Sequence, residues 1–417
     1  MLRRSFVAGM GGLWLPTAAR AEPKLAANPF TLGVASGRPK AQSIVLWTRL
    51  MAERESGERL VAPVPVDWAV AEDEAMQHII GRGQAIAEAQ WAHSVHVEVQ
   101  GLKPGRPYWY RFAVRGTPSP VGRTRTAPVE SERLTRLRFA FASCQQYEQG
   151  FYSAFRHMAA EDADFVVHLG DYIYEISWGR ELVRRHEGGR PTMLDEYRDR
   201  YALYKSDADL QAAHAAFPWI FTWDDHEVDD DYTNDISPQE PHRDRFLAQR
   251  AAAYQAFWEH MPLPFSMRPR GPSMRIYDRY RFGDLAEFHL LDDRQYRDHH
   301  ACRTAMPRNK VMAACEERLD PGRTMLGAEQ EAWLADGLRN ASTRWNVIAQ
   351  QTLMAQLDRG AEGKHAYWHD GWDGYVPARQ RLLDAVAASP VRDMLVLSGD
   401  VHAFWAADLK RDFDAPG

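Results

Sequence analysis

The chain has 417 residues, of which 45% are hydrophobic and 26% are charged, and its formal net charge is −6. This is the composition of an ordinary globular protein, and the length is enough for two domains of roughly 100–200 residues each. A mildly acidic chain gives no electrostatic footprint for duplex nucleic acid, so we expect no stable nucleic-acid partner.

Residues 1–21 predict a twin-arginine signal peptide. Arg3 and Arg4 are adjacent, an apolar run extends from residue 6 to residue 15, and residues 19–21 form a small-x-small cleavage site. An ordinary Sec signal or a chance arginine pair is the alternative. We expect the twin-arginine translocase as a partner during export, and a periplasmic or secreted location. The mature chain has no further apolar run long enough for a transmembrane segment.

Residues 28–125 predict a β-sandwich. Apolar and polar residues alternate at period two, as in 108–114, and turn residues separate these segments. Short strands at regular spacing are typical of sandwiches. The loop at 102–105, with the strand pattern that follows it, is similar to a fibronectin-III-type loop that enters a strand. Residues 126–135 are polar and predict a linker.

From residue 136 to residue 417 strand-like and helical segments alternate, which predicts an α/β domain. The predicted strands are 137–142, 165–169, 219–223, 285–291, 345–348 and 394–397. The predicted helices are 151–160, 250–260 and 328–338.

Possible metal ligands directly follow several of these strands. They are Cys144, Asp171 with Tyr174, Asp225 with His226, and Asp400 with His402. Ligand sites in open α/β sheets lie at the carboxyl ends of strands, so we expect these side chains to meet. Each residue alone has a simpler explanation, such as a core cysteine, a turn or a solvated acidic loop. Their recurrence at strand after strand favours one site.

The residue types in these clusters suit a site with two metal ions, which can clamp the attacking and leaving oxygens of a phosphoryl group. Gly170 before Asp171 allows the tight turn that a bridging carboxylate needs. Thiolate and neutral imidazole are metal ligands, whereas carboxylates such as Asp225 and Asp400 suit Ca²⁺. The clusters therefore predict a metal-dependent phosphoesterase.

The three cysteines divide into a pair and a single residue. Cys302 and Cys315 lie 13 residues apart in a polar stretch, and we expect them to pair in an oxidising compartment, two free thiols being the alternative. Cys144 is then unpaired, which in an exported protein needs a reason.

The strand-end clusters resemble those of the PhoD-like (alkaline phosphatase D) branch of the metallophosphoesterases. Further segments that match this family are 30–37, 46–50, 291–297 and 325–330. The resemblance covers residues 28–410 and implies an N-terminal fibronectin-III/Ig-like β-sandwich, followed by a two-sheet αββα catalytic domain. Residues 170–174 are also similar to purple acid phosphatases, but Cys144 in place of a carboxylate favours the PhoD-like branch.

The resemblance also implies cofactors, an Fe(III) ion with one or two Ca(II) ions, and a role for each candidate residue. Cys144, Asp171, Tyr174 and His402 would hold the iron, with Asp171 as a bridge. Asp225 and Asp400 would face calcium, and so would Asp230, where many relatives carry Asn. His226 would lie beside the leaving group, as an acid or as a transition-state stabiliser. The implied reaction is hydrolysis of phosphomonoesters and phosphodiesters through a metal-bound hydroxide.

The residues that would contact the substrate are less specific. We expect Arg294, His365, Trp368 and Trp372 to line the substrate cleft, with a salt-bridged arginine and aromatic core packing as the alternatives. The substrate class stays open among small phosphate esters, phospholipids and nucleotides.

Two further functions stay open at this point. One is a phospholipase D-like or nuclease phosphodiesterase on the same scaffold. The other is a degenerate, truncated binding protein, because relatives usually continue well beyond residue 417 with further strands of the second sheet.

Overall fold

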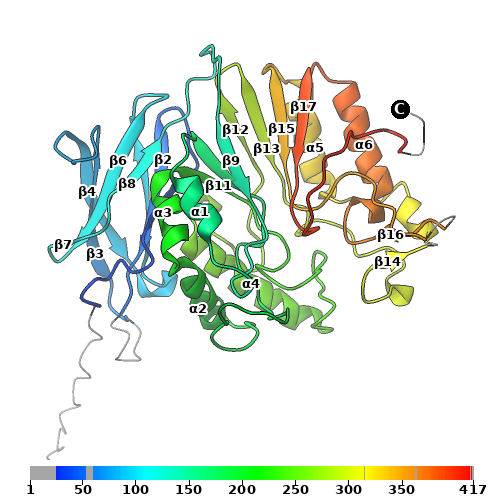
Figure 1. Ribbon diagram of the computed structural model, residues 1–417, viewed down its shortest axis with the longest axis horizontal. Helices are drawn as coiled ribbons and strands as arrows, with labels where there is room; N and C mark the ends of the chain where they lie inside the picture. The colour runs from blue at the N-terminus through cyan, green and yellow to red at the C-terminus, as the bar shows by residue number, and fades with distance from the viewer. Residues whose placement is uncertain (1–24, 53–59, 314, 362–363, 414, 416–417) are drawn as a thin grey trace, which may run out of the picture.

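The computed structural model describes residues 25–52, 60–313, 315–361, 364–413 and 415 (Figure 1). The predicted signal peptide at residues 1–21 lies outside the described residues. Among the described ranges, no helix combines the length and the apolar character needed to cross a membrane.

A six-stranded sheet combines strands from both halves of the sequence, in the order β5-β2-β1-β11-β10-β9. The strands are β1 (Val34–Gly37), β2 (Ser43–Arg49), β5 (Ser94–Gln100), β9 (Phe139–Ala142), β10 (Phe165–His168) and β11 (Pro218–Phe221). The pairs β1–β11, β11–β10 and β10–β9 are parallel, whereas the pairs β1–β2 and β2–β5 are antiparallel. All residues of β10 and β11 are buried, as expected for parallel strands covered on both faces.

A four-stranded sheet in the order β12-β13-β15-β17 packs against one face of the six-stranded sheet. Its strands are β12 (Asp278–Phe282), β13 (Ala286–Leu290), β15 (Trp345–Ala349) and β17 (Asp393–Leu397). The core between the sheets is aromatic at its centre. The ring of Phe165 stacks on Phe282 with 4.3 Å between centroids, and Phe139 meets Phe288 edge to face at 5.0 Å.

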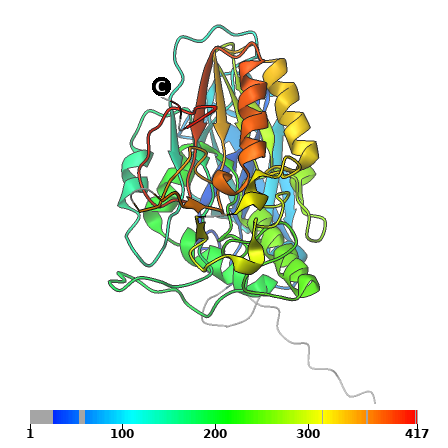
Figure 2. The ribbon, with the colours of Figure 1, turned by 90° about the vertical axis from the view of Figure 1, so that its right-hand side faces the viewer.

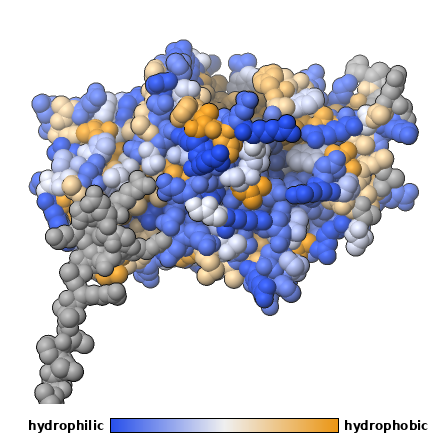
Figure 3. Space-filling view, turned by 60° about the horizontal axis from the view of Figure 1, so that its bottom comes forward, coloured by the Kyte–Doolittle hydropathy of each residue, from blue (hydrophilic) through white to orange (hydrophobic). Residues whose placement is uncertain are grey.

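Helices cover the outer faces of both sheets. On the six-stranded sheet lie α1 (Ser153–Ala159), α2 (Leu194–Lys205), α3 (Ala208–Ala216) and α4 (Arg243–His260). On the four-stranded sheet, α5 (Gly327–Arg339) and α6 (Val376–Ala387) lie side by side (Figure 2). The layers therefore run helices, sheet, sheet, helices. The lower face of Figure 1 is mainly hydrophilic, with apolar side chains in separate patches (Figure 3).

The N-terminal part is β-rich, as the sequence predicts. Its second sheet has the order β4-β3-β6-β7, with β8 paired to β6. The strands are β3 (Val64–Ala71), β4 (Ile79–Ala87), β6 (Pro107–Val114), β7 (Thr117–Pro118) and β8 (Gly122–Arg125). This sheet shares a core with β1, β2 and β5. The second layer of the N-terminal part is thus formed by β1, β2 and β5, which belong to the six-stranded sheet. The sequence pattern did not predict that one sheet would extend through both parts of the chain.

The mixed α/β character of residues 136–417 is confirmed. Each predicted strand lies within two residues of an observed one. The predicted helix at 250–260 begins earlier in the structure, at Arg243. Strand β12 and helices α2, α3 and α6 were not predicted.

Candidate metal centre and active site

The predicted ligands meet at the carboxyl ends of β9, β10, β11 and β17, where the strands of both sheets end (Figure 1). Backbone hydrogen bonds join the first two turns. The Cys144 N–H donates to the Gly170 carbonyl and the Gln145 N–H to the Asp171 carbonyl, both at 3.1 Å. Gly170 has a φ of 108°, and a Cβ there would collide with the Cβ of Asp224. The tight turn expected at Gly170 is therefore present, and only glycine fits it.

Cys144, Asp171, Tyr174 and His402 lie together as one group. The Tyr174 hydroxyl donates to Asp171 Oδ2 at 2.8 Å and lies 3.1 Å from His402 Nε2. Ligand atoms of Cys144, Asp171 and His402 all lie within 4.8 Å of one another. The turn after β17 is tied to this group, because the Asp400 N–H donates to Cys144 Sγ at 3.2 Å.

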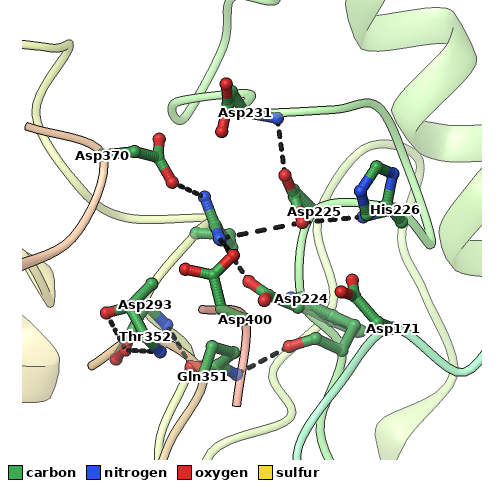
Figure 4. Close-up of polar contacts among 12 residues, drawn as sticks. Asp171, Asp224, Asp225, His226, Asp231, Asp293, Gln351, Thr352, Asp370 and Asp400 are labelled. Atoms are coloured by element: carbon green, nitrogen blue, oxygen red, sulfur yellow. Dashed lines mark hydrogen bonds and ion pairs between the residues drawn. The ribbon is translucent and has the colours of Figure 1, made fainter. Parts of the chain in front are cut away.

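Asp225 lies at the centre of a larger acidic cluster (Figure 4). Three groups of possible ligand atoms, each within 4.8 Å, contain it: one with Asp171 and His226, one with Asp224 and Asp400, and one with Asp230 and Asp231. The structure thus brings together all seven residues that the sequence predicts as ligands, namely Cys144, Asp171, Tyr174, Asp225, Asp230, Asp400 and His402. Asp224 and Asp231 join them without having been predicted.

The backbone at this site is strained at several of the same positions. Four of the predicted ligands have a left-handed conformation, with φ of 55° at Cys144, 57° at Asp171, 66° at Asp400 and 52° at His402. Side-chain-bearing residues rarely adopt this conformation, and such strain is concentrated at functional sites. The turns therefore fix the directions of these side chains at a conformational cost.

The buried carboxylates fit a bound cation. Within the described part of the chain, Asp171 Oδ1, Asp224 Oδ2 and Asp400 Oδ2 are buried and have no hydrogen-bond partner. Burial raises the pKa of the Cys144 thiol well above its usual value, and the charge of Asp171 adds to this effect. Burial likewise raises the pKa of Asp224 and of Asp400, against the effect of a nearby arginine. A multivalent cation would reverse these penalties and deprotonate the thiol.

Arg294 is fully buried among these carboxylates. Its Nε donates to Asp224, its Nη1 to Asp370 Oδ2 at 2.6 Å, and its Nη2 to Asp400 Oδ1 at 3.3 Å. Asp225 Oδ1 lies 3.7 Å from Nη2. We predicted a substrate contact for Arg294, but its guanidinium is occupied by carboxylates, so the salt-bridged alternative describes it better.

His226 is held by a carboxylate on its inner side. Its Nδ1 lies 2.6 Å from Glu175 Oε2, and its Nε2 lies 3.9 Å from Asp230 Oδ1. Burial by itself would lower the pKa of His226, but the charges of Glu175, Asp225 and Asp171 outweigh burial and hold this pKa well above its usual value. The imidazole therefore holds its proton more tightly than a free histidine does.

Glu227 connects two of the turns and was missed by sequence reasoning. It accepts the backbone N–H groups of Asp171 at 3.0 Å, Tyr172 at 2.6 Å and Asp224 at 2.8 Å. These bonds fix the turn after β10 against the turn after β11. Its place next to His226 in a predicted ligand cluster was the available signal.

The aromatic segment after β15 divides between surface and core. His365 is exposed and pairs with Asp358 Oδ2 at 2.5 Å, and Trp368 lies in the short strand β16 (Tyr367–Trp368). Trp372 is 0% exposed, and its Nε1 donates to Gln350 Oε1 at 3.0 Å. The predicted cleft role of Trp372 is therefore wrong: it fills the core beneath α5 and α6.

The expected disulfide between Cys302 and Cys315 is present, with 6.0 Å between the Cα atoms. It closes a loop that contains strand β14 (Val311–Met312), which pairs with β16. From this loop Lys310 reaches the acidic cluster, where its Nζ lies 2.7 Å from Asp231 Oδ2. Lys310 was not predicted, because nothing in the local sequence marks it as part of the site.

Trp178 was also missed. Its indole lies 4.7 Å from the Tyr174 ring and 5.4 Å from the His226 ring, measured between centroids. It follows Tyr174 by only four positions, which was the available signal.

Comparison with known proteins gives concordant matches. Residues 139–417 match the family model of the PhoD-like phosphatases, and residues 17–128 match that of the PhoD-like phosphatase N-terminal domain. Alkaline phosphatase D of Bacillus subtilis (strain 168) is 44% identical over 430 residues, which covers 99% of this chain and 73% of the relative. A solved structure of PhoD superposes with a TM-score of 0.90 at 45% identity, covering 94% of this chain and 76% of that one.

Proposed function

Because this chain belongs to the PhoD-like phosphatase family and is a phosphoesterase, we propose that it hydrolyses phosphomonoesters and phosphodiesters at a site that holds Fe(III) and Ca(II). The observation that carries the proposal is the meeting of Cys144, Asp171, Tyr174 and His402 beside three buried carboxylate oxygens that have no partner in the described part of the chain.

The donor chemistry assigns the two kinds of ion to different parts of the site. Cys144, Asp171, Tyr174 and His402 supply thiolate, carboxylate, phenolate and imidazole, a set that suits iron. Asp225, Asp400 and Asp230 supply only oxygen, which suits calcium. Bound there, the ions would neutralise charge on the phosphoryl oxygens and lower the pKa of the attacking water.

The chain's own residues supply the proton and the geometry. Glu175 holds His226 Nδ1 at 2.6 Å, which leaves Nε2 to donate a proton to the leaving oxygen as the P–O bond breaks. Arg294 compensates for the mutual repulsion of Asp224, Asp225 and Asp400, so that the cluster is preorganised.

Export and fold class are part of the same proposal. The predicted twin-arginine signal at residues 1–21 supports the proposal of a periplasmic or secreted enzyme. The order of helices, sheet, sheet, helices supports the αββα arrangement of metallophosphoesterases, and the two β layers of the N-terminal part support a fibronectin-III/Ig-like sandwich at residues 28–125.

The test is turnover of p-nitrophenyl phosphate and bis-p-nitrophenyl phosphate. Chelator-treated protein is expected to be inactive and to regain activity with iron and calcium. Asp171→Asn is expected to remain inactive under the same conditions, whereas Asp336→Asn, which alters an exposed ion pair on α5, is expected to match the wild type. Absence of turnover in the metal-loaded protein would contradict the proposal and favour a degenerate binding protein. Competition by phospholipid or DNA would reveal a phospholipase or nuclease preference.

A further inference from the structure

The indole of Trp178 touches both sides of the candidate centre. Its ring lies 5.4 Å from the His226 ring at an interplanar angle of 30°, and 6.1 Å from the His402 ring at 22°. The Tyr174 ring meets it edge to face at 4.7 Å. Trp178 therefore borders the imidazole on the leaving-group side and two side chains of the predicted iron group.

Trp178 is placed differently from the tryptophans that fill the core. Five others, Trp47, Trp219, Trp223, Trp258 and Trp372, are less than 2% exposed. Trp178 is only half-buried, whereas its neighbours Tyr174 and His226 are buried. Its backbone is held near the site, because its carbonyl accepts a hydrogen bond from Gln149 Nε2 at 3.2 Å. A half-open indole beside a reaction centre offers apolar aromatic surface to a bound molecule.

The position of His226 identifies which part of the substrate meets this indole. Under the proposed function, the phosphoryl group binds at the carboxylate cluster and His226 Nε2 faces the leaving oxygen. The group attached to that oxygen therefore extends along Trp178. A planar aromatic group can stack on an indole, whereas a flexible polyol gains little from it.

We propose that Trp178 is a specificity-determining residue that stacks on the leaving group, so that the enzyme favours nucleotides and other esters with a planar aromatic group. This inference rests on the proposed function, because it takes the leaving-group side of the site from the role of His226. It goes further by naming the class of leaving group.

The test compares 5′-AMP with ribose 5-phosphate, which have the same phosphorylated sugar and differ in the base. Both are measured as competing substrates in p-nitrophenyl ester hydrolysis. Their dissociation constants are measured by calorimetry in an Asp171→Asn background with iron and calcium added, where no hydrolysis is expected during the titration. We expect 5′-AMP to bind about 5- to 150-fold more tightly, which corresponds to about 1–3 kcal/mol of base stacking.

Three variants separate stacking from other roles. Trp178→Leu is expected to bring the 5′-AMP to ribose 5-phosphate ratio close to one, and Trp178→Phe to retain most of it. Phe265→Leu removes a half-exposed aromatic ring that packs on His96 and Trp258, and is expected to leave the ratio unchanged.

Three results would overturn the inference. They are a ratio near one in the wild type, a ratio that survives in Trp178→Leu, or an equal loss of affinity for both ligands in that variant, which would indicate that Trp178 only orients His226. Absence of ester turnover would instead contradict the proposed function, and the calorimetric ratio would still decide whether Trp178 stacks on a base.

Discussion

Glu175 is the residue that most directly sets the protonation of His226. Its Oε2 lies 2.6 Å from Nδ1, and its charge is the largest of the effects that raise the pKa of His226 against burial. A general acid loses its proton as the pH rises through its pKa, and this loss produces the alkaline limb of a pH–rate profile.

Glu175→Gln is therefore expected to lower the pKa of His226 and to move the alkaline limb of kcat to lower pH. The measurement is the pH–rate profile of the metal-loaded enzyme. Glu130→Gln, which alters an exposed carboxylate, serves as the control and is expected to leave the limb in place. An unchanged limb in Glu175→Gln would remove His226 from the acid role.

Lys205 is a buried cation outside the metal centre. It is 2% exposed, and its Nζ lies 4.4 Å from the centroid of the Trp47 ring. Burial lowers the pKa of Lys205 to about 7 from 10.5. Between these values the unfolded chain binds a proton that the folded chain does not. Stability therefore rises with pH across this window, and the full cost of burying the lysine applies below about pH 7.

Lys205→Met is accordingly expected to stabilise the protein at neutral pH by up to about 5 kcal/mol. This advantage is expected to disappear as the pH approaches the pKa of free lysine. Urea unfolding of variant and wild type at several pH values measures the difference. Lys103→Met, at an exposed lysine, is the control. A pH-independent difference would contradict the shifted pKa.

At the residue scale, the sequence predicts the ligands but not their neighbours. Asp171 and Asp400 could be found because each follows an apolar strand, so chain direction alone brings them to one edge. Lys310 and Trp178 could not be found this way, because long loops carry them to the site. Trp372 was misassigned because burial depends on which sheet face a turn packs against, and local composition does not show that.

At the scale of elements, the disulfide loop is a unit that connects the surface to the acidic cluster. The Cys302–Cys315 bond closes it, β14 pairs with β16, and the His369 N–H donates to the Lys310 carbonyl at 2.9 Å. Its stability therefore depends on the disulfide as well as on strand pairing.

Cys302→Ser with Cys315→Ser is expected to lower the free energy of unfolding by about 3 kcal/mol, because a short covalent loop restricts the unfolded chain. Urea denaturation measures this change. The iron content is expected to be unchanged, because both cysteines are bonded to each other and neither belongs to the predicted iron group. Loss of iron from this double variant would contradict the division of the cysteines into one pair and one ligand.

Strand pairing is the feature of the elements that the sequence predicts least. The apolar run at 219–223 predicts β11, but it does not show that Gly37 of β1 lies opposite Trp219 of β11. A Cβ on Gly37 would lie 2.6 Å from the Pro262 carbonyl oxygen, so the approach requires glycine. The polar stretch at 126–135 was predicted to be a linker, yet the six-stranded sheet contains strands from both sides of it.

At the scale of the whole molecule, the N-terminal and later parts share hydrogen bonds as well as a sheet. The Trp47 indole N–H donates to the Glu259 carbonyl at 2.9 Å, and Arg38 pairs with Asp278 at 2.6 Å. We expect the protein to unfold in a single cooperative transition when it is measured by calorimetry. Two separate transitions, the first of them confined to residues 28–125, would show that the two parts fold independently.

In the function proposed above, Cys144 and its neighbours bind iron while the surrounding carboxylates bind calcium. Elemental analysis of the purified wild type and of Cys144→Ala tests it most directly. We expect iron together with calcium in the wild type, and loss of iron in Cys144→Ala. Zinc or manganese in the wild type, or an unchanged iron content in Cys144→Ala, would contradict it.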